Sequence, residues 1–186
     1  IKYCYRVAGI VGLMMIKALK IKNIEASYYA IDLGIAMQLT NISRDIMEDF
    51  NKKRIYLPED SGITNDILDN PNELNNMKIC NEVNKILIKS DIYYKSSLNG
   101  FRYIPIKSRF SILVALRIYE AIGKKIKRTG ARFLKENIYI NNYEKFYIVL
   151  KTVIEFIIFF IFPLHRKKHN PYLHEHLQGM INVNKL

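Results

Sequence analysis

One stretch, residues 34–58 (GIAMQLTNISRDIMEDFNKKRIYLP), constrains the fold more than any other part of the chain. Within it, Asn41, Asp45 and Asp49 recur at every fourth position. On a helix each step of four rotates the side chain by only about 40°, so the three residues share one face. The neighbouring stripe is apolar and consists of Ile35, Leu39, Ile42 and Ile46. This pattern predicts an amphipathic helix that packs against a core.

A column of oxygen ligands on one helical face suits a hard divalent cation such as Mg²⁺, which completes its shell with water and phosphate oxygens. Gln38 and Arg44 lie within a turn of the column. The following loop brings cations that could meet a phosphate group, namely Lys52, Lys53 and Arg54. Acidic residues at this spacing also form ordinary solvated helix faces, and that alternative stays open on the pattern alone.

The opening segment YCYRVAGIVG, Tyr3 to Gly12, combines large apolar residues with small ones. It begins a predicted helix that continues to about Lys20. Glycine inside a helix costs up to about 1 kcal/mol relative to alanine, so Gly9 and Gly12 need a reason. Either a second helix approaches closely, or the helix leaves room for a long apolar ligand.

Helical periodicity continues along the chain, with no strand-period run and no hairpin signal, so we expect an all-α fold. Asn70, Pro71 and Glu73 are typical of a helix start, with Asn as N-cap, Pro at the first position and Glu at the third. Asn141 and Glu144 repeat the cap pattern for a last helix that ends at Pro163. The predicted helices cover residues 26–50, 70–98, 108–135 and 141–163.

The last predicted helix carries a run, Thr152 to Leu164, that is apolar apart from Glu155. It is short for a bilayer span. A buried terminal helix is one interpretation, and an anchor on an anionic membrane surface is another. Basic residues that would suit the anchor follow directly, namely Arg166, Lys167 and Lys168. All the histidines lie in this tail, where HRKKH (165–169) offers a weak zinc-pair pattern.

Composition excludes several classes of protein. The net charge is +12, but the chain is also rich in Asn and Ile, so biased base composition explains much of the lysine excess. The sequence has no stretch in which aromatic and basic residues alternate, so this indicator of nucleic-acid binding is missing. Cys4 and Cys80 provide neither a zinc pattern nor a disulfide framework. Hydrophobic residues at 49% fit an ordinary globular domain. The two cysteines fit a reducing cytoplasm, and a location at the inner face of a membrane is also compatible with the sequence.

Two long motifs carry a resemblance to a known family. The QLTNISRDIMED helix followed by RIYLP, and the YCYRVAGIVG segment before it, resemble the two signatures of the squalene and phytoene synthase family. This resemblance extends to about Lys151. It implies the isoprenoid synthase helical bundle, in which the chain would lack the N-terminal helices. We therefore divide the chain into residues 1–164, the C-terminal part of that domain, and a tail of residues 165–186.

The resemblance also implies residue roles. Asn41, Asp45 and Asp49 would hold Mg²⁺, with Mn²⁺ as an alternative, and Tyr3 together with the two aspartates would be catalytic. Diphosphate and prenyl-chain contacts would come from Gln38, Arg44, Arg54, Tyr56, Val7, Ala8, Val11 and Gly12. Relatives often carry a tyrosine where this chain has Ala131, so we expect no tyrosine contact from that position.

The implied reaction is head-to-head condensation of two prenyl diphosphates, most simply two geranylgeranyl diphosphates giving phytoene in carotenoid synthesis, without NADPH. A farnesyl-using squalene or dehydrosqualene synthase remains an alternative. So do a class I terpene cyclase or head-to-tail prenyltransferase, and a non-catalytic or decayed relative. The family's first aspartate-rich motif does not occur in these 186 residues, so we expect this chain to be inactive alone.

Overall fold

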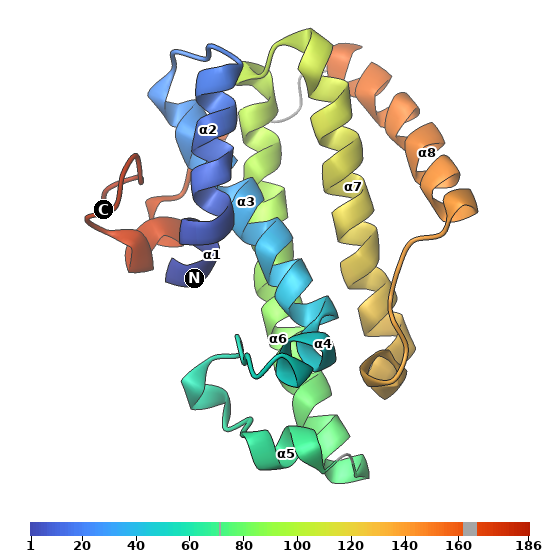
Figure 1. Ribbon diagram of the computed structural model, residues 1–186. Helices are drawn as coiled ribbons and strands as arrows, with labels where there is room; N and C mark the ends of the chain where they lie inside the picture. Colours follow the sequence, from blue (N-terminus) through green and yellow to red (C-terminus); the bar gives the residue numbers. More distant parts are fainter. Residues whose placement is uncertain (71, 162–166) are drawn as a thin grey trace.

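A computed structural model describes residues 1–70, 72–161 and 167–186 of the chain. Within these ranges the regular structure is helical and contains no strand, which confirms the predicted fold class (Figure 1). The long helices are α3 (Ile24–Arg44), α6 (Glu73–Ser97), α7 (Ile106–Thr129) and α8 (Asn142–Ile161). Shorter helices are α1 (Lys2–Cys4), α2 (Ile10–Ala18), α4 (Ile46–Asn51) and α5 (Asn65–Asp69).

Among the described residues, five tighter or wider helical segments complete the element order. A π-helical segment, η1 (Tyr5–Gly9), joins α1 to α2. The others are 3₁₀ segments: η2 (Glu59–Ser61), η3 (Leu98–Tyr103), η4 (Gly130–Leu134) and η5 (Pro171–Leu177). Several residues singled out in the sequence, namely Pro71, Pro163, Leu164, His165 and Arg166, lie outside the described residues.

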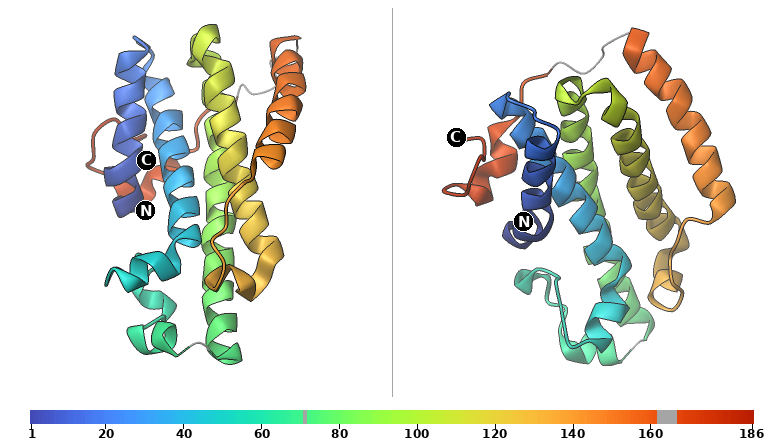
Figure 2. Two further views of the ribbon diagram at one scale, coloured as in Figure 1. Left: turned by 45° about the vertical axis from the view of Figure 1, so that its right-hand side comes forward. Right: turned by 45° about the horizontal axis from the view of Figure 1, so that its top comes forward.

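Helices α3 and α6 lie side by side at the centre of the bundle. Helix α2 packs on one side of α3, α7 lies on the other side, and α8 packs on α7 (Figure 2). Apolar positions at helical spacing make the core, and Ile31, Ile35, Leu113 and Leu116 are fully buried there. A buried polar contact also joins α3 to α6, because the Thr40 hydroxyl lies 3.0 Å from the Tyr94 hydroxyl.

The helix that carries the polar column differs from the continuous helix predicted over residues 26–50. It begins at Ile24, where the Asn23 side chain accepts the Glu25 N–H, and α3 ends at Arg44. Asp45 adopts φ −100° and ψ 15°, and α4 follows it. Hydrogen bonds with helical spacing nevertheless continue on both sides, from Asp45 N to Asn41 O at 2.9 Å and from Asp49 N to Asp45 O at 2.8 Å. The column is therefore bent at its middle residue and keeps its spacing.

One predicted helix start was wrong and the other is confirmed. Asn70 ends α5, a helix that the sequence did not predict, and its side chain bonds back to the Asp66 carbonyl. The N-cap of α6 is Asn72, whose Oδ1 accepts the Asn75 N–H at 2.8 Å. At α8 the capping box forms in both directions, since Asn141 and Glu144 each accept the other's backbone N–H at 2.8 Å.

The ends of the last two long helices also differ from expectation. The predicted helix over 108–135 stops at Thr129, because Gly130 has φ +56°, a value that a helix cannot continue. The interpretation of the last helix as buried is wrong for one of its faces, where Phe146 and Ile154 are 72% and 56% exposed. None of the helices in the described ranges is both long enough and apolar enough to cross a bilayer.

The C-terminal segment, residues 167–186, crosses back to α1, α3 and α6 (Figure 1). Three tyrosines from three elements donate to its carbonyls: Tyr5 to Ile181, Tyr29 to Lys167 and Tyr93 to Leu173, each at 2.8 Å. Leu177 and Val183 are buried members of the main core. The segment thus packs as part of the same body as the helices.

Candidate functional site

The two sequence motifs are in contact through a pair of aromatic side chains. Tyr3, from the first motif, stacks on Tyr56, from the loop after α4, with ring centroids 4.6 Å apart and planes at 21°. A hydrogen bond with Tyr56, burial and the nearby Asp49 charge raise the pKa of Tyr3 to about 12. Tyr3 therefore stays a neutral phenol at physiological pH and can donate a hydrogen bond or present its ring, but it is no general base.

Asn41 holds an oxygen atom that lacks a protein partner. Its Oδ1 is buried and makes no hydrogen bond within the described part of the chain, while its Nδ2 approaches Gln38 Oε1 at 3.5 Å. A buried polar atom left without a partner costs free energy, so native proteins rarely leave one without a reason. An oxygen in this state is a suitable ligand atom for a hard cation.

Asp49 is a carboxylate whose charge is poorly compensated. Burial raises the pKa of Asp49, and the neighbouring charges of Asp45 and Glu48 raise it further. Lys52 and Arg54 act in the opposite direction but do not cancel this shift. Asp49 lines a small hollow together with Arg54 and Tyr56. A bound cation would relieve the repulsion between these carboxylates, and the adjacent Arg54 could meet an anion.

Asp45 departs from the simple picture of three free ligands. Arg44 Nε and Nη2 both donate to its carboxylate at 2.7 Å, a bidentate ion pair. The pair lines a separate hollow of about 820 Å³ that faces residues 133–140. Here Arg44 is occupied by Asp45 and is not free for a diphosphate. The structure thus gathers Asp49, Arg54, Tyr56 and Tyr3, and sets Arg44 and Asp45 beside them as a pair.

A mostly apolar cavity of about 430 Å³ reaches this part of α3, because Asn41 lines it. Four residues predicted to contact a prenyl chain line it, namely Val7, Ala8, Val11 and Gly12, and Gln38 and Asn41 line it as well. The close approach of a second helix is confirmed at Gly12, where a Cβ would stand 2.3 Å from the Ala30 carbonyl oxygen. Gly12 also borders the cavity, and its contact with an apolar ligand stays a prediction. Close approach of α2 to α3 shapes the cavity at this point.

The sequence reasoning missed the opposite side of the cavity. Helix α7 contributes Ser111, Ala115 and Tyr119 to the lining, and η3 contributes Phe101. Ser111, Ala115 and Tyr119 are spaced four apart, so two small residues precede an aromatic one on a single helix face. That row was a readable signal, but no residue type in it indicated a ligand by itself.

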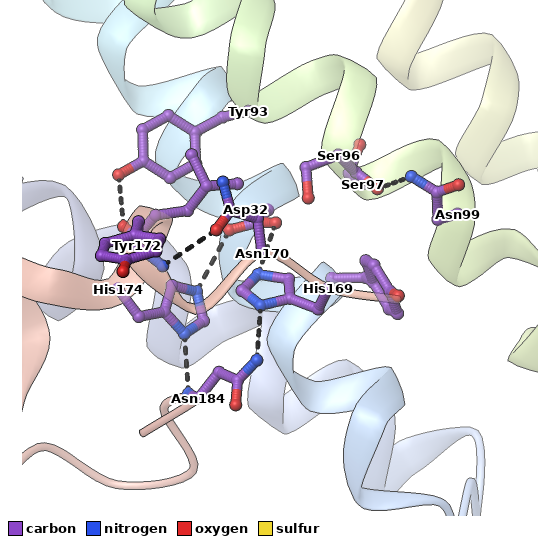
Figure 3. A network of polar contacts seen from close by, with 12 residues as sticks. Asp32, Tyr93, Ser96, Ser97, Asn99, His169, Asn170, Tyr172, His174 and Asn184 are labelled. Atoms are coloured by element: carbon purple, nitrogen blue, oxygen red, sulfur yellow. Dashed lines mark hydrogen bonds and ion pairs between the residues drawn. The ribbon is translucent and has the colours of Figure 1, made fainter. Parts of the chain in front are cut away.

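A second cluster of side chains that could bind a metal lies between α3 and the C-terminal segment (Figure 3). The fully buried Asp32 carboxylate contacts His169 Nε2 at 3.0 Å and His174 Nε2 at 3.1 Å. The three ligand atoms lie within 4.8 Å of one another, a spacing that could hold a metal ion. Burial alone would disfavour the charged carboxylate, but hydrogen bonds from both histidines outweigh it and lower the pKa of Asp32.

The hydrogen bonds of His174 argue against metal ligation in this cluster. Its Nδ1 accepts the Asn184 backbone N–H at 2.9 Å. A backbone N–H can only donate, so Nδ1 carries no proton, and the neutral ring must carry its proton on Nε2, facing Asp32. A protonated nitrogen cannot ligate a metal. Of the two histidines in the weak HRKKH pattern, His169 contacts Asp32, and His165 lies outside the described residues.

Known proteins that are similar to this chain belong to one family. The family described as squalene/phytoene synthase matches residues 1–144. The chain is 37% identical to 15-cis-phytoene synthase of Enterobacter agglomerans, over 71% of this chain and 45% of that protein. It is 29% identical to phytoene synthase of Rhodobacter capsulatus, over 90% of this chain and 50% of that protein.

A solved structure titled as a dehydrosqualene synthase in complex with ligand is also similar, with a TM-score of 0.71 and 26% identity. The match covers 83% of this chain and 55% of that one. The chain thus spans about half the length of the relatives it matches. Because the family match includes both motifs and the helices between them, this chain belongs to the squalene/phytoene synthase family.

Proposed function

We propose that this chain forms the C-terminal part of a head-to-head prenyltransferase that joins two geranylgeranyl diphosphates into phytoene in carotenoid synthesis and releases diphosphate. The observation that carries the proposal is the apolar cavity of about 430 Å³ whose lining includes Gln38 and Asn41, next to the Asp49, Arg54 and Tyr56 hollow. An apolar chain with a charged head needs this combination. Phytoene synthases among the relatives support the substrate class.

The residues fit a divalent cation, Mg²⁺ or Mn²⁺. The unpartnered Asn41 Oδ1 and the Asp49 carboxylate would hold it, and Asp45 would join them after its release from Arg44. When bound, the ion would neutralise charge on a diphosphate as its carbon–oxygen bond breaks. The Arg44 guanidinium freed in this exchange would then be available to the same diphosphate.

The remaining residues have roles that follow from their surroundings. Arg54 supplies positive charge beside Asp49, and Lys52, now bonded to Glu48, supplies more at the same end of the helix. Val7, Ala8, Val11 and Gly12 exclude water from the prenyl chain. Tyr3, a neutral phenol stacked on Tyr56, would present its ring and hydroxyl to a carbocation without accepting its proton.

Binding can be tested on the chain itself. Thermal unfolding should shift upward when Mg²⁺ and geranylgeranyl thiodiphosphate are added together, and less with either alone. The double variant N41L/D49N should lose the shift, while E59Q, which changes an exposed acid outside the column, should keep it. An equal shift in N41L/D49N would remove the metal role from these residues.

The reaction can be tested by extending the chain. This chain alone should give no product, and a fusion to the N-terminal half of the Enterobacter agglomerans enzyme should give phytoene without NADPH. Dehydrosqualene or squalene from farnesyl diphosphate would replace the geranylgeranyl assignment. No product from the fusion, despite ligand-dependent stabilisation, would favour a non-catalytic family member.

A further inference from the structure

The C-terminal turn, residues 178–184, presents one backbone carbonyl to the first helical segments of the chain. Gly179 and Asn182 have positive φ values of +86° and +53°. Glycine adopts such values freely, and asparagine does so more readily than most other residues. Between them, the Ile181 side chain is 71% exposed, while the Ile181 carbonyl oxygen accepts the Tyr5 hydroxyl at 2.8 Å. The turn therefore contributes a hydrogen-bond acceptor to this contact.

Side-chain hydrogen bonds hold the C-terminal turn on the bundle. Gln178 Nε2 donates to the carbonyls of His174 and Asn184, at 3.1 and 3.0 Å, and so spans the turn. The Asn184 N–H donates to His174 Nδ1 at 2.9 Å, and His174 Nε2 lies 3.1 Å from the buried Asp32 carboxylate of α3 (Figure 3). The turn that carries the Ile181 carbonyl is therefore tied to α3 by a chain of hydrogen bonds.

Tyr5, the donor in this contact, is also closely packed. Its side chain is 3% exposed, and burial raises the pKa of its phenol, so the hydroxyl remains a donor at physiological pH. A Cβ on Gly9 would stand 3.1 Å from Tyr5 Cδ2, so the ring lies against a position that has no side chain. Tyr5 and Gly9 bound η1, where the Ile10 N–H bonds the Tyr5 carbonyl in the wide π-helical pattern. Single π-helical turns are frequent at functional sites.

Tyr3 lies two residues before Tyr5 and occupies the other side of the same helical segment. Two residues rotate a helix by about 200°, so a rotation that moves one ring moves the other in the opposite direction. Tyr3 is half-exposed and stacks on Tyr56, whereas Tyr5 is buried and bonded to the C-terminal turn. Val7 and Ala8, further along η1, line the apolar cavity. A fixed Tyr5 would therefore set the direction of Tyr3 and of this part of the cavity wall.

We propose that Tyr5 is a positioning residue, held by the Ile181 carbonyl so that η1 directs Tyr3 toward Tyr56 and the candidate site. The family match ends at residue 144, so the turn that supplies the acceptor lies beyond the matched residues. The consequence of this contact for catalysis rests on the proposed function, whereas the orientation of Tyr3 can be measured on the chain itself. The Y5F substitution keeps the ring that packs against Gly9 and removes only the donor.

Fluorine NMR of the chain with 3-fluorotyrosine placed at position 3 tests the orientation of Tyr3. Y5F should shift that resonance by more than its line width, and Q178A, which loosens the turn from the other end, should shift it in the same direction. The matched control is Y93F, which removes a buried tyrosine donor to the same C-terminal segment, but from α6. Y93F should leave the resonance in place. An unchanged resonance in Y5F, or equal shifts in Y5F and Y93F, would overturn the inference.

Steady-state kinetics of the fusion to the N-terminal half of the Enterobacter agglomerans enzyme tests the consequence for the reaction. Y5F should lower kcat about tenfold and keep KM for geranylgeranyl diphosphate within about twofold, because Tyr3 is proposed to act on the carbocation and not in substrate binding. Y93F should keep both constants, although it loses an equivalent hydrogen bond, so simple destabilisation would not reproduce the difference.

A Y5F fusion with the kcat of the parent fusion would also overturn the inference. If the parent fusion gives no product, the proposed function fails, and the fluorine resonance of the chain alone then decides whether Tyr5 positions Tyr3. The two proposals can therefore fail separately.

Discussion

Gly34 shows how one residue sets the distance between two elements. It lies where η1 meets α3, and a Cβ at Gly34 would stand 2.4 Å from the Ala8 carbonyl oxygen. Backbone atoms cannot move aside as a side-chain end can. Ala8 also lines the apolar cavity, so this contact fixes one side of the candidate site.

We predict that G34A lowers the free energy of unfolding by about 2 kcal/mol, because overpacking outweighs the helix propensity gained by alanine. Urea denaturation measures the change. The control is G123A on α7, where the nearest atom is the mobile Leu87 Cδ2 at 3.3 Å. We expect G123A to stay within about 1 kcal/mol of the parent. Equal losses in both variants would show that backbone contact at Gly34 is unimportant.

Asp32 is the residue at which a charge is buried most deeply. We predict that D32N destabilises the fold by about 3–5 kcal/mol, because the amide cannot accept from both histidines as the carboxylate does. The lowered pKa of Asp32 sets the direction in which the free energy of unfolding changes with pH. The stability from ionised Asp32 is present above the ordinary pKa of an aspartate and is lost as the pH falls through the lower folded pKa.

Acid titration of the parent and of D32N, followed by urea unfolding at each pH, should show the gap between them closing only at strongly acidic pH. D91N is the control, because Asp91 makes a half-exposed pair with Lys127 and should cost at most about 1 kcal/mol. Added Zn²⁺ should leave the unfolding temperature of the parent unchanged. A rise with Zn²⁺ that H174A removes would instead establish metal ligation.

At the scale of elements, the caps decide where helices begin. Asn141 and Glu144 form their reciprocal bonds within four residues of chain, so sequence spacing alone predicts them correctly. Asn70 and Asn72 have the same residue type and compete for the start of α6. The choice falls to Asn72 because Asn70 is taken by α5.

We predict that N141A costs about 1 kcal/mol and loosens the first turns of α8. Hydrogen exchange of the α8 amides measures this locally. N142A alters the exposed first helical residue without touching the cap and should leave exchange nearly unchanged. Faster exchange spread evenly over α6 and α8 would contradict a local role for the cap.

At the scale of the whole molecule, the C-terminal segment joins elements that are far apart in sequence. Its carbonyls accept from Tyr5 in η1, Tyr29 in α3 and Tyr93 in α6. Its histidines reach Asp32 across 137 and 142 residues of chain. This closure lies on the side of α3 opposite to Asn41, since the nine residues from Asp32 to Asn41 make about two and a half helical turns.

We predict that the double variant Y5F/Y93F loses about 2 kcal/mol of stability, because each change leaves a carbonyl of the C-terminal segment without its donor. Thermal or urea unfolding measures the loss. Y172F, which changes a tyrosine that is 70% exposed, should be neutral. A neutral Y5F/Y93F would mean that these two hydroxyl groups do not contribute to holding the segment.

The sequence by itself determined the features that depend on local spacing. Periodicity placed the long helices, the four-residue spacing put Asn41, Asp45 and Asp49 on one column, and both family motifs were readable from adjacent residues. Each of these depends on the geometry of a single helix or a single turn. They were therefore available before any tertiary contact was known.

Only the tertiary structure decided which of these residues meet. It stacked Tyr3 on Tyr56, tied Asp45 to Arg44, and brought α7 across the cavity. It also left one face of α8 exposed and placed two tail histidines on Asp32. The physical reason is that burial and pairing depend on which helices pack together, and residues distant along the chain carry no local pattern that records their partners.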